Sequence, residues 1–207
     1  SYFEHPPVIK EIHLGGGTPT FFAPEQLKKL ISSILEDAVV ADDHAFSFEA
    51  HPSSTTEEHL QTLYDIGFKR ISVGVQDVSP EILTAINRHQ TVEQVAYVTH
   101  KAREIGYTSV NYDIIYGLPF QKKKNIHQTI DFISEYKPDR IAYYSYAHVP
   151  WVSASQRAFT LDNVPKGKAK NELYQLGKDR LKQIGYDAIG MDHFCLPDEA
   201  LNVAYIE

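Results

Sequence analysis

Three consecutive glycines, Gly15, Gly16 and Gly17, directly follow a short, largely apolar segment of the chain. Because three side chains are absent, main-chain N–H and C=O groups are open to direct contact with a ligand. The helical pattern from Pro24 would turn its positive end toward the same place. The loop is not a dinucleotide fingerprint, because Thr20 stands where the third glycine belongs, and no lysine follows it as in a P-loop. We therefore expect a ligand loop of another kind.

Polar side chains also follow the other strand-like segments, at the point where each segment ends. In parallel α/β folds, the carboxyl ends of the strands form the binding site. Polar groups at six such ends favour one large polar ligand over isolated core groups. The residues concerned are Gly15–Gly17 and Thr18, Glu49 and His51, Gln76 and Asp77, Asp113 and Tyr116, Tyr146 and His148, and Asp192 and His193.

The residue types alone leave several of these roles open. Glu49 could cap the next helix or accept two hydroxyls of a ribose. Gln76 could satisfy the backbone or hold a ligand. Asp113 lies inside a strand, where an unpaired carboxylate is costly, so a site role is favoured. His148 and His193 fit structural hydrogen bonding better than metal binding.

Arg88 and Cys195 each have a simple structural interpretation. Arg88 could pair with Glu81 or Glu93 on the surface, or its guanidinium could bind a ligand carboxylate. Cys195 is the only cysteine, so it forms no internal disulfide and cannot build a metal or cluster site by itself.

Strand-like and helix-like segments alternate along the chain, which predicts crossover connections and a parallel sheet. Nearly continuous apolar runs such as Ile71–Val75 are expected when both faces of the sheet are covered. We predict an α/β fold, a partial (β/α)6 TIM-like barrel of parallel strands, in a single domain over residues 1–207. The predicted strands are Val8–Leu14, Phe46–Ala50, Arg70–Val75, Ser109–Tyr116, Arg140–Tyr146 and Tyr186–Met191. The predicted helices are Pro24–Glu36, Thr56–Ile66, Pro80–Asn87, Thr91–Ile105, Ile126–Tyr136, Lys168–Ile184 and Leu196–Ile206.

Composition narrows the class of protein. The 207 residues correspond to about one domain, and an apolar content of 43% suffices for a core. Acidic residues outnumber basic ones by 27 to 20, so we expect no nucleic-acid partner. No apolar run suggests a membrane span, so we expect no membrane partner. The single cysteine suggests a reducing compartment, and we expect a cytoplasmic protein.

Seven motifs together resemble those of the radical S-adenosylmethionine (SAM) enzymes, and among these the oxygen-independent coproporphyrinogen III oxidases. The tyrosine-rich, NRHQ and GMDHF motifs are the most specific to the oxidases. The motifs are Gly15–Phe21 (GGGTPTF), Glu49–Pro52 (EAHP), Gly74–Asp77 (GVQD), Asn87–Gln90 (NRHQ), Asn111–Pro119 (NYDIIYGLP), Tyr144–Pro150 (YSYAHVP) and Gly190–Phe194 (GMDHF).

The resemblance implies a partial (β/α)6 barrel that binds a [4Fe–4S] cluster and two SAM molecules. It implies anaerobic oxidative decarboxylation of coproporphyrinogen III to protoporphyrinogen IX through a 5′-deoxyadenosyl radical, with a porphyrinogen substrate and an electron donor as partners. By the same resemblance, Gly16 and Glu49 would contact the first SAM, Glu49 through its ribose hydroxyls. The residues that would line the second SAM are Gly17, Thr18, Gln76, Arg88, Asp113 and Ala147.

One feature of the family is missing from this sequence. The cluster of these enzymes is held by a Cys-x3-Cys-x2-Cys loop after the first strand, and the chain contains only Cys195. We expect a domain truncated at both ends, with its cluster-binding strand and loop upstream of Ser1 in a longer parent. Such a fragment would hold no cluster and would be inactive alone.

Two other functions compete with this interpretation. A haem-carrying chaperone of the same superfamily would share the GGGTP and GLP motifs, but the oxidase-specific motifs disfavour it. A metal-dependent hydrolase on a barrel would use His51, Asp113, His148 and His193 as ligands. It leaves the three glycines unexplained.

Overall fold

The computed structural model describes residues 5–151, 156 and 159–199. In this part of the chain, one sheet has the strand order β1-β2-β3-β4-β5-β7-β6, and β1 to β5 run parallel. The strands are β1 (Val8–Leu14), β2 (Val39–Ala50), β3 (Phe68–Gln76), β4 (Ser109–Tyr116), β5 (Arg140–Ser145), β6 (Asp187–Gly190) and β7 (His193–Cys195). The helices are α1 (Pro24–Leu35), α2 (Glu57–Asp65), α3 (Pro80–Ala85), α4 (Val92–Ile105), α5 (Lys123–Tyr136) and α6 (Gly167–Gln183), with 3-10 turns η1 (Pro19–Phe21) and η3 (Leu161–Asn163).

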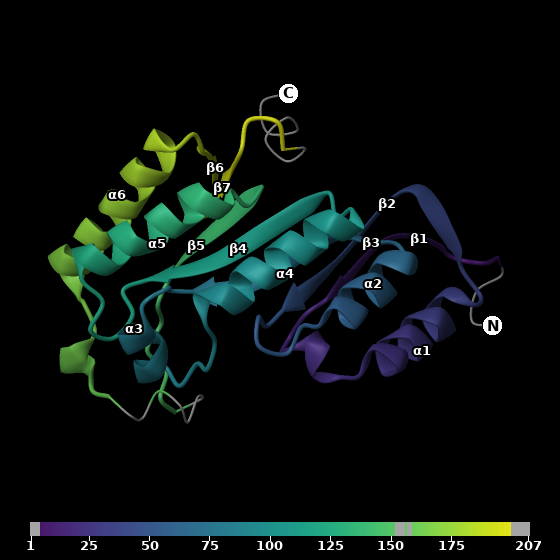
Figure 1. Cartoon of the computed structure of the whole chain (residues 1–207), viewed down its shortest axis with the longest axis horizontal. Coiled ribbons are helices and arrows are strands. Elements are labelled where there is room, and N and C mark those ends of the chain that lie inside the picture. The colour runs from purple at the N-terminus through teal and green to yellow at the C-terminus, as the bar shows by residue number, and fades with distance from the viewer. Residues whose placement is uncertain (1–4, 152–155, 157–158, 200–207) are drawn as a thin grey trace.

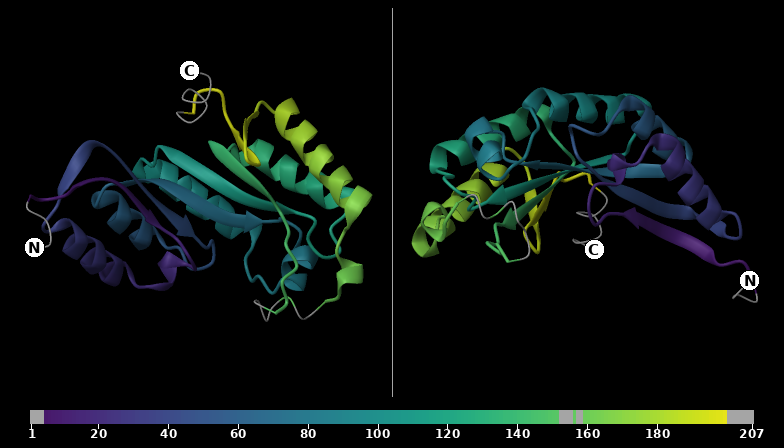
Figure 2. Two further views of the ribbon diagram at one scale, coloured as in Figure 1. Left: turned by 180° about the vertical axis from the view of Figure 1, so that it is seen from behind. Right: turned by 90° about the horizontal axis from the view of Figure 1, so that it is seen from below.

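The sheet is open and curved. Helices α1, α2, α4, α5 and α6 lie along its convex outer side (Figure 1), and the strands come to the front when the molecule is seen from behind (Figure 2, left). The view from below shows the helices arching over the sheet, with no helix of the described residues on the inner side (Figure 2, right). The predicted α/β fold of a partial, unclosed barrel is confirmed.

The hydrophobic core fills the space between the outer side of the sheet and the helices. Alternate strand residues such as Phe46, Phe48 and Val73 are almost fully buried there, against Leu60 of α2 and Val98 of α4. Because successive strand side chains point to opposite faces, the residues between them point to the inner side. The core therefore holds the sheet from one side and leaves the other side available for a site.

Local signals in the sequence explain the helix ends. The hydroxyl of Thr56 accepts a hydrogen bond from the His59 N–H, and the hydroxyl of Thr91 accepts one from the Gln94 N–H. Both threonines are the predicted N-caps, and each satisfies a backbone donor that the first turn leaves free. Gly106 ends α4 with φ of 114°, a conformation that glycine adopts without a steric penalty. These helices are confirmed to within a few residues.

The last part of the sheet differs in two ways from the prediction. The strand predicted at Tyr186–Met191 is confirmed as β6, but an additional strand that was not predicted, β7, lies between β5 and β6 and pairs antiparallel with both. Met191 and Asp192 form the tight turn between β6 and β7 with positive φ values of 45° and 60°. Residues 196–199 form turns and not the start of the predicted helix Leu196–Ile206, whose remaining residues lie outside the described part.

The prediction that both faces of the sheet are covered is also wrong. On the inner side, β3 presents Arg70 and Ser72, and β4 presents Ser109 and Asn111, to a hollow in the surface. Hydrophobic residues between them reach the outer core, which is why the run around Val73 looks continuously apolar. Within the described residues, no helix has the length and apolar character needed to cross a membrane.

Candidate active site

The carboxyl ends of β1 to β4 meet at one edge of the sheet, as parallel pairing requires. Most of the predicted site residues lie along this edge, in two groups. We call the first the glycine side; it comprises Gly15–Gly17, Thr18 and Glu49. We call the second the arginine side; it comprises Gln76, Arg88 and Asp113 at the ends of β3 and β4.

On the glycine side, the loop after β1 exposes bare main chain. Gly16 and Gly17 have φ values of 81° and 147°, and a Cβ atom built on either would meet no atom within 4 Å. Thr18 is half-buried and begins the 3-10 turn η1. The positive φ values favour glycine, and the free space above the loop lets a ligand approach the backbone directly.

Glu49 lies beside this loop at the end of β2. Its Oε1 would be 2.9 Å from a Cβ at Gly15, and it lies 3.6 Å from Nε2 of His13. The Glu49 side chain is 42% exposed, so its carboxylate is open to a ligand. It does not cap the following helix, because Thr56 does so. That alternative is therefore wrong, and a ligand role for Glu49 stays a prediction.

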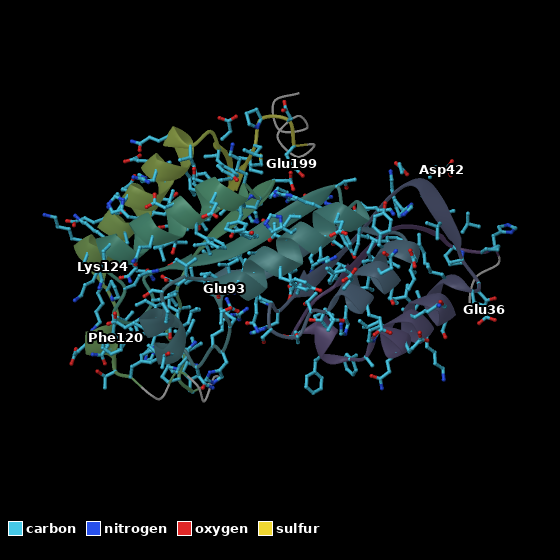
Figure 3. The ribbon with its side chains drawn as sticks, in the orientation of Figure 1. Glu36, Asp42, Glu93, Phe120, Lys124 and Glu199 are labelled. Carbon is cyan, nitrogen blue, oxygen red and sulfur yellow. The ribbon has the colours of Figure 1, made fainter. Side chains whose placement is uncertain are left out.

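On the arginine side, Arg88 turns inward and does not pair with Glu81 or Glu93. Glu93 lies at the start of α4 (Figure 3), and neither acid forms an ion pair with Arg88 within the described residues. The Arg88 Nε donates to Oε1 of Gln90 at 2.7 Å, and its Nη2 donates to the Gly74 carbonyl. Burial lowers the pKa of Arg88 to about 10, while the Asp113 charge opposes the shift.

Gln90 braces the same strand end. Its Nε2 donates to the Val75 carbonyl at 2.7 Å, while its Oε1 receives the Arg88 hydrogen bond. The β3–β4 register shifts between Gly74 and Gln76, and Gln76 takes a positive φ of 66°. The two side chains of the NRHQ motif therefore hold an irregular strand end in place, so that the Gln76 side chain faces a cavity.

This cavity has a volume of about 470 Å³ and is lined by Gln76 and Arg88 of the arginine side and by His51. Tyr146 and Gln156 form its far wall, and the Ala147 carbonyl accepts a hydrogen bond of 3.3 Å from Gln156 Nε2. The pKa of His51 is lowered to about 4, first by burial and then by the positive charge of Arg88. The cavity thus favours the neutral form of the His51 imidazole beside the fixed positive charge of Arg88.

Asp113 is held in one orientation on the inner side of β4. Its Oδ2 accepts from the Ser72 hydroxyl at 2.9 Å, and its Oδ1 accepts from Asn111 Nδ2 at 2.8 Å. Burial raises the pKa of Asp113, and these two hydrogen bonds oppose the shift. An oriented carboxylate with remaining lone pairs can accept hydroxyl groups of a ligand.

Asp77 serves as a brace and does not line the cavity. It is 1% exposed, and its two carboxylate oxygens accept from the Ser79 N–H at 2.7 Å and from Gln121 Nε2 at 2.8 Å. Gln121 Oε1 in turn accepts from the Gly117 N–H. Burial raises the pKa of Asp77 to about 6. The pair links the loops after β3 and β4.

The histidines do not form a metal site. His148 lies near the Tyr146 hydroxyl, and His193 bonds to the Met191 carbonyl. No group of three potential ligands within the described residues, which include His51, Asp113, His148 and His193, could hold a metal ion. The arrangement required for the metal-dependent hydrolase is therefore not formed there.

Sequence reasoning missed Gln90 and Gln121, as well as Arg70 and Arg140 on the inner side of the sheet. Gln90 stands in the NRHQ motif, but its bracing role was not recognised, and nothing in the sequence marks Gln121, which bonds mainly to backbone groups. The arginine at position 70 carried a usable signal, because Arg70 and Ser72 alternate with apolar residues, as expected for a strand with one polar face.

The family model of the radical SAM superfamily matches residues 2–133. An oxygen-independent coproporphyrinogen III oxidase of Helicobacter pylori (strain J99) is 41% identical over 197 residues, which are 95% of this chain and 43% of that protein. The corresponding protein of Pseudomonas aeruginosa is 38% identical over 196 residues, covering 94% and 43% of the two chains.

Solved structures also match this chain. Coproporphyrinogen III oxidase from Escherichia coli superposes with a TM-score of 0.91 at 38% identity, over 95% of this chain and 45% of that one. Elp3 from the archaeon Methanocaldococcus infernus has a TM-score of 0.66 at 18% identity, over 81% and 44%, and so shares the fold. The chain spans less than half the length of the curated relatives it matches.

Proposed function

Since the chain belongs to the radical SAM superfamily, we propose that it is the SAM-binding part of an oxygen-independent coproporphyrinogen III oxidase. SAM and a [4Fe–4S] cluster are the cofactors of this superfamily. The proposed reaction converts coproporphyrinogen III to protoporphyrinogen IX in haem biosynthesis. A porphyrinogen substrate, an electron donor and a cytoplasmic location belong to the same proposal, as does the assignment of residues 1–207 to one truncated domain.

The observation that carries the proposal is the convergence of both groups on one edge of the sheet. Bare main chain at Gly16 and Gly17, an open carboxylate at Glu49, and the braced cavity with Gln76 and Arg88 adjoin one another there. A sulfonium nucleoside offers matching groups, since it carries ribose hydroxyls, a carboxylate and a positive sulfur.

In this proposal, the glycine side contacts both SAM molecules, and the arginine side contacts the second. We assign Gly16 and Glu49 to a first SAM, with the Glu49 carboxylate accepting the ribose hydroxyls. The residues assigned to a second SAM are Gly17, Thr18, Gln76, Arg88, Asp113 and Ala147. Nη1 of Arg88 makes no hydrogen bond within the described residues and is free to bind a carboxylate.

When bound and reduced by one electron, SAM would supply a carbon radical that takes a hydrogen atom from a propionate side chain, and the loss of CO2 and of one electron to an acceptor would leave a vinyl group. A carbon radical reacts with water and protein alike, so the residues of this chain must position the reacting carbon and keep the site dry. The rigid hydrogen bonding of the arginine side suits that task.

The cluster does not fit the residues of this chain. Its family motif has three cysteines, and the chain has Cys195 alone, buried in β7 away from the glycine loop. We therefore assign no step of the cluster chemistry to the residues described here.

Calorimetric titration of the chain with SAM tests the proposal. We expect binding by the wild type, and a loss of about tenfold or more in Arg88→Met, because one charge-assisted hydrogen bond is removed. Lys10→Met is the matched control, since it removes a positive charge that is 64% exposed and pairs with Asp43. A wild-type chain without affinity for SAM would refute the proposal. In the full-length protein, haem transfer without decarboxylation would favour the chaperone.

A further inference from the structure

A second hollow lies on the inner side of the sheet, toward the amino ends of the strands. It has a volume of about 260 Å³, and Arg70 and Arg140 line it together with Ser47, Ser72 and Asn111. Arg70 begins the pairing of β3 with β4, opposite Ser109, and Arg140 begins β5, opposite Asn111. The two guanidinium groups thus reach the hollow from either side of β4.

Neither guanidinium has a hydrogen-bond or ion-pair partner among the residues that the structure describes. No hydrogen bond or ion pair reaches the side chain of Arg70 or Arg140 anywhere in residues 5–151, 156 and 159–199. Arg140 Nε is fully buried without a hydrogen-bond partner, and so is Oδ1 of Asn111 on the neighbouring strand. Buried polar atoms are rarely left unsatisfied, and an exception calls for an explanation such as a ligand.

The charges around the hollow favour an anion. Burial lowers the pKa of Arg140, and the positive charge of Arg70 lowers it further, whereas the Glu199 carboxylate opposes the shift. Glu199 accepts a hydrogen bond of 3.3 Å from the Ser109 hydroxyl. Glu11 also lines the hollow but forms no ion pair with either arginine within the described residues. Two neighbouring cations repel each other, and a bound anion relieves that repulsion.

Two side chains that line the hollow also contact Asp113 of the proposed active site. Ser72 and Asn111 line the hollow, and their side chains donate to Asp113 on the arginine side. Arg70 pairs at the level of Ser109, four residues before Asp113, which corresponds to about 13 Å along the strand. A ligand that fills both places must therefore be extended and carry negative charge away from its reacting end.

We propose that Arg70 and Arg140 form a carboxylate subsite that binds a propionate of the tetrapyrrole remote from the one being decarboxylated. The inference rests on the proposed function and deepens it, because coproporphyrinogen carries a propionate on each of its four rings. Arginine suits this task, because its planar guanidinium group can donate two parallel hydrogen bonds to one carboxylate.

Titration of the chain with coproporphyrin III, the air-stable oxidised form of the substrate, tests the subsite by porphyrin fluorescence. We expect Arg70→Met and Arg140→Met each to weaken binding by about tenfold or more, with Arg→Lys variants in between. SAM affinity, measured on the same proteins, should not change. Lys10→Met controls for net charge.

Unfolding by urea separates binding from structure. Replacing Arg140 by methionine removes an unpaired buried donor and should leave the stability unchanged or raise it, whereas a purely structural arginine would lower it. Equal coproporphyrin affinity in the wild type and both methionine variants would overturn the subsite, as would a wild type that does not bind the porphyrin. Loss of SAM binding by the wild type would instead refute the proposed function.

Discussion

The glycine side and the arginine side occupy the same edge of the sheet but are built differently. On the glycine side, Gly16 and Gly17 have open space above them, and Oε1 of Glu49 lies 3.6 Å from Nε2 of His13. On the arginine side, Arg88 and Asp113 are each fixed by hydrogen bonds to two groups.

This difference indicates two ways to prepare a binding site. Glycine main chain has no side-chain rotamers to restrict when a ligand binds. Long side chains lose more freedom on binding, so a site that uses them gains affinity when neighbours hold them beforehand. We therefore expect substitutions of braces to affect stability most, and substitutions of glycines to affect ligand binding most.

The largest effect on stability should follow Asp77→Ala, which removes the brace next to Gln76 of the arginine side. The change leaves the Ser79 N–H and the Gln121 amide without their acceptor in a buried place. We expect a loss of about 2 kcal/mol in the free energy of unfolding, the typical cost of leaving buried donors without an acceptor. Urea denaturation monitored by circular dichroism measures it.

Glu49→Ala is the matched carboxylate deletion on the glycine side. Because Glu49 is 42% exposed and its pairing with His13 is loose, we expect a change within about 0.5 kcal/mol. Equal losses in the two variants would mean that the two sides are braced alike and would remove the basis of the comparison.

A smaller effect concerns the ionisation of His51 in the cavity. Its folded-state pKa of about 4 lies below the ordinary value of about 6.5, so the unfolded chain binds the proton first as the pH falls. The stability that His51 contributes is present above pH 6.5 and is lost as the pH falls toward 4. Arg88→Met should raise the pKa of His51 yet leave it below the ordinary value, because burial is the larger cause.

NMR titration of the His51 ring resonances measures this shift directly. Lys10→Met should leave the titration unchanged, since Lys10 lies on β1 and pairs with Asp43. An unchanged pKa in Arg88→Met would show that the Arg88 charge does not act on the cavity, and the arginine side would lose its electrostatic character.

The sequence allowed the edge of the sheet to be predicted, because parallel strands bring their carboxyl ends together wherever helices separate them. Capping residues such as Thr56 and Thr91 marked the helix starts for the same local reason. The residue types did not predict that the Arg88 side chain turns inward. One of its partners is the backbone carbonyl of Gly74, and a backbone carbonyl is present in every residue and gives no sequence signal.

The short strand β7 escaped prediction for two reasons. Three residues, His193–Cys195, are too few to show a period. The turn before them places Met191 at a positive φ, a conformation that the sequence does not suggest for methionine, and the predicted strand therefore runs one residue too far. The polar inner face was visible in the alternation at Arg70 and Ser72 but was hidden by the apolar run after them.

The effect of Gly16→Ala on stability should lie between those of Asp77→Ala and Glu49→Ala. A Cβ there meets no atom within 4 Å, so only the φ of 81° opposes it, at a cost of about 1 kcal/mol. Gly185→Ala is the matched control, because Gly185 has φ of 99° and the same free space but lies after α6. We expect equal stability losses and a fall in SAM affinity in Gly16→Ala alone, measured by calorimetry. If both variants bind SAM like the wild type, the free space above Gly16 is not where the ligand lies, and the glycine side is only a turn.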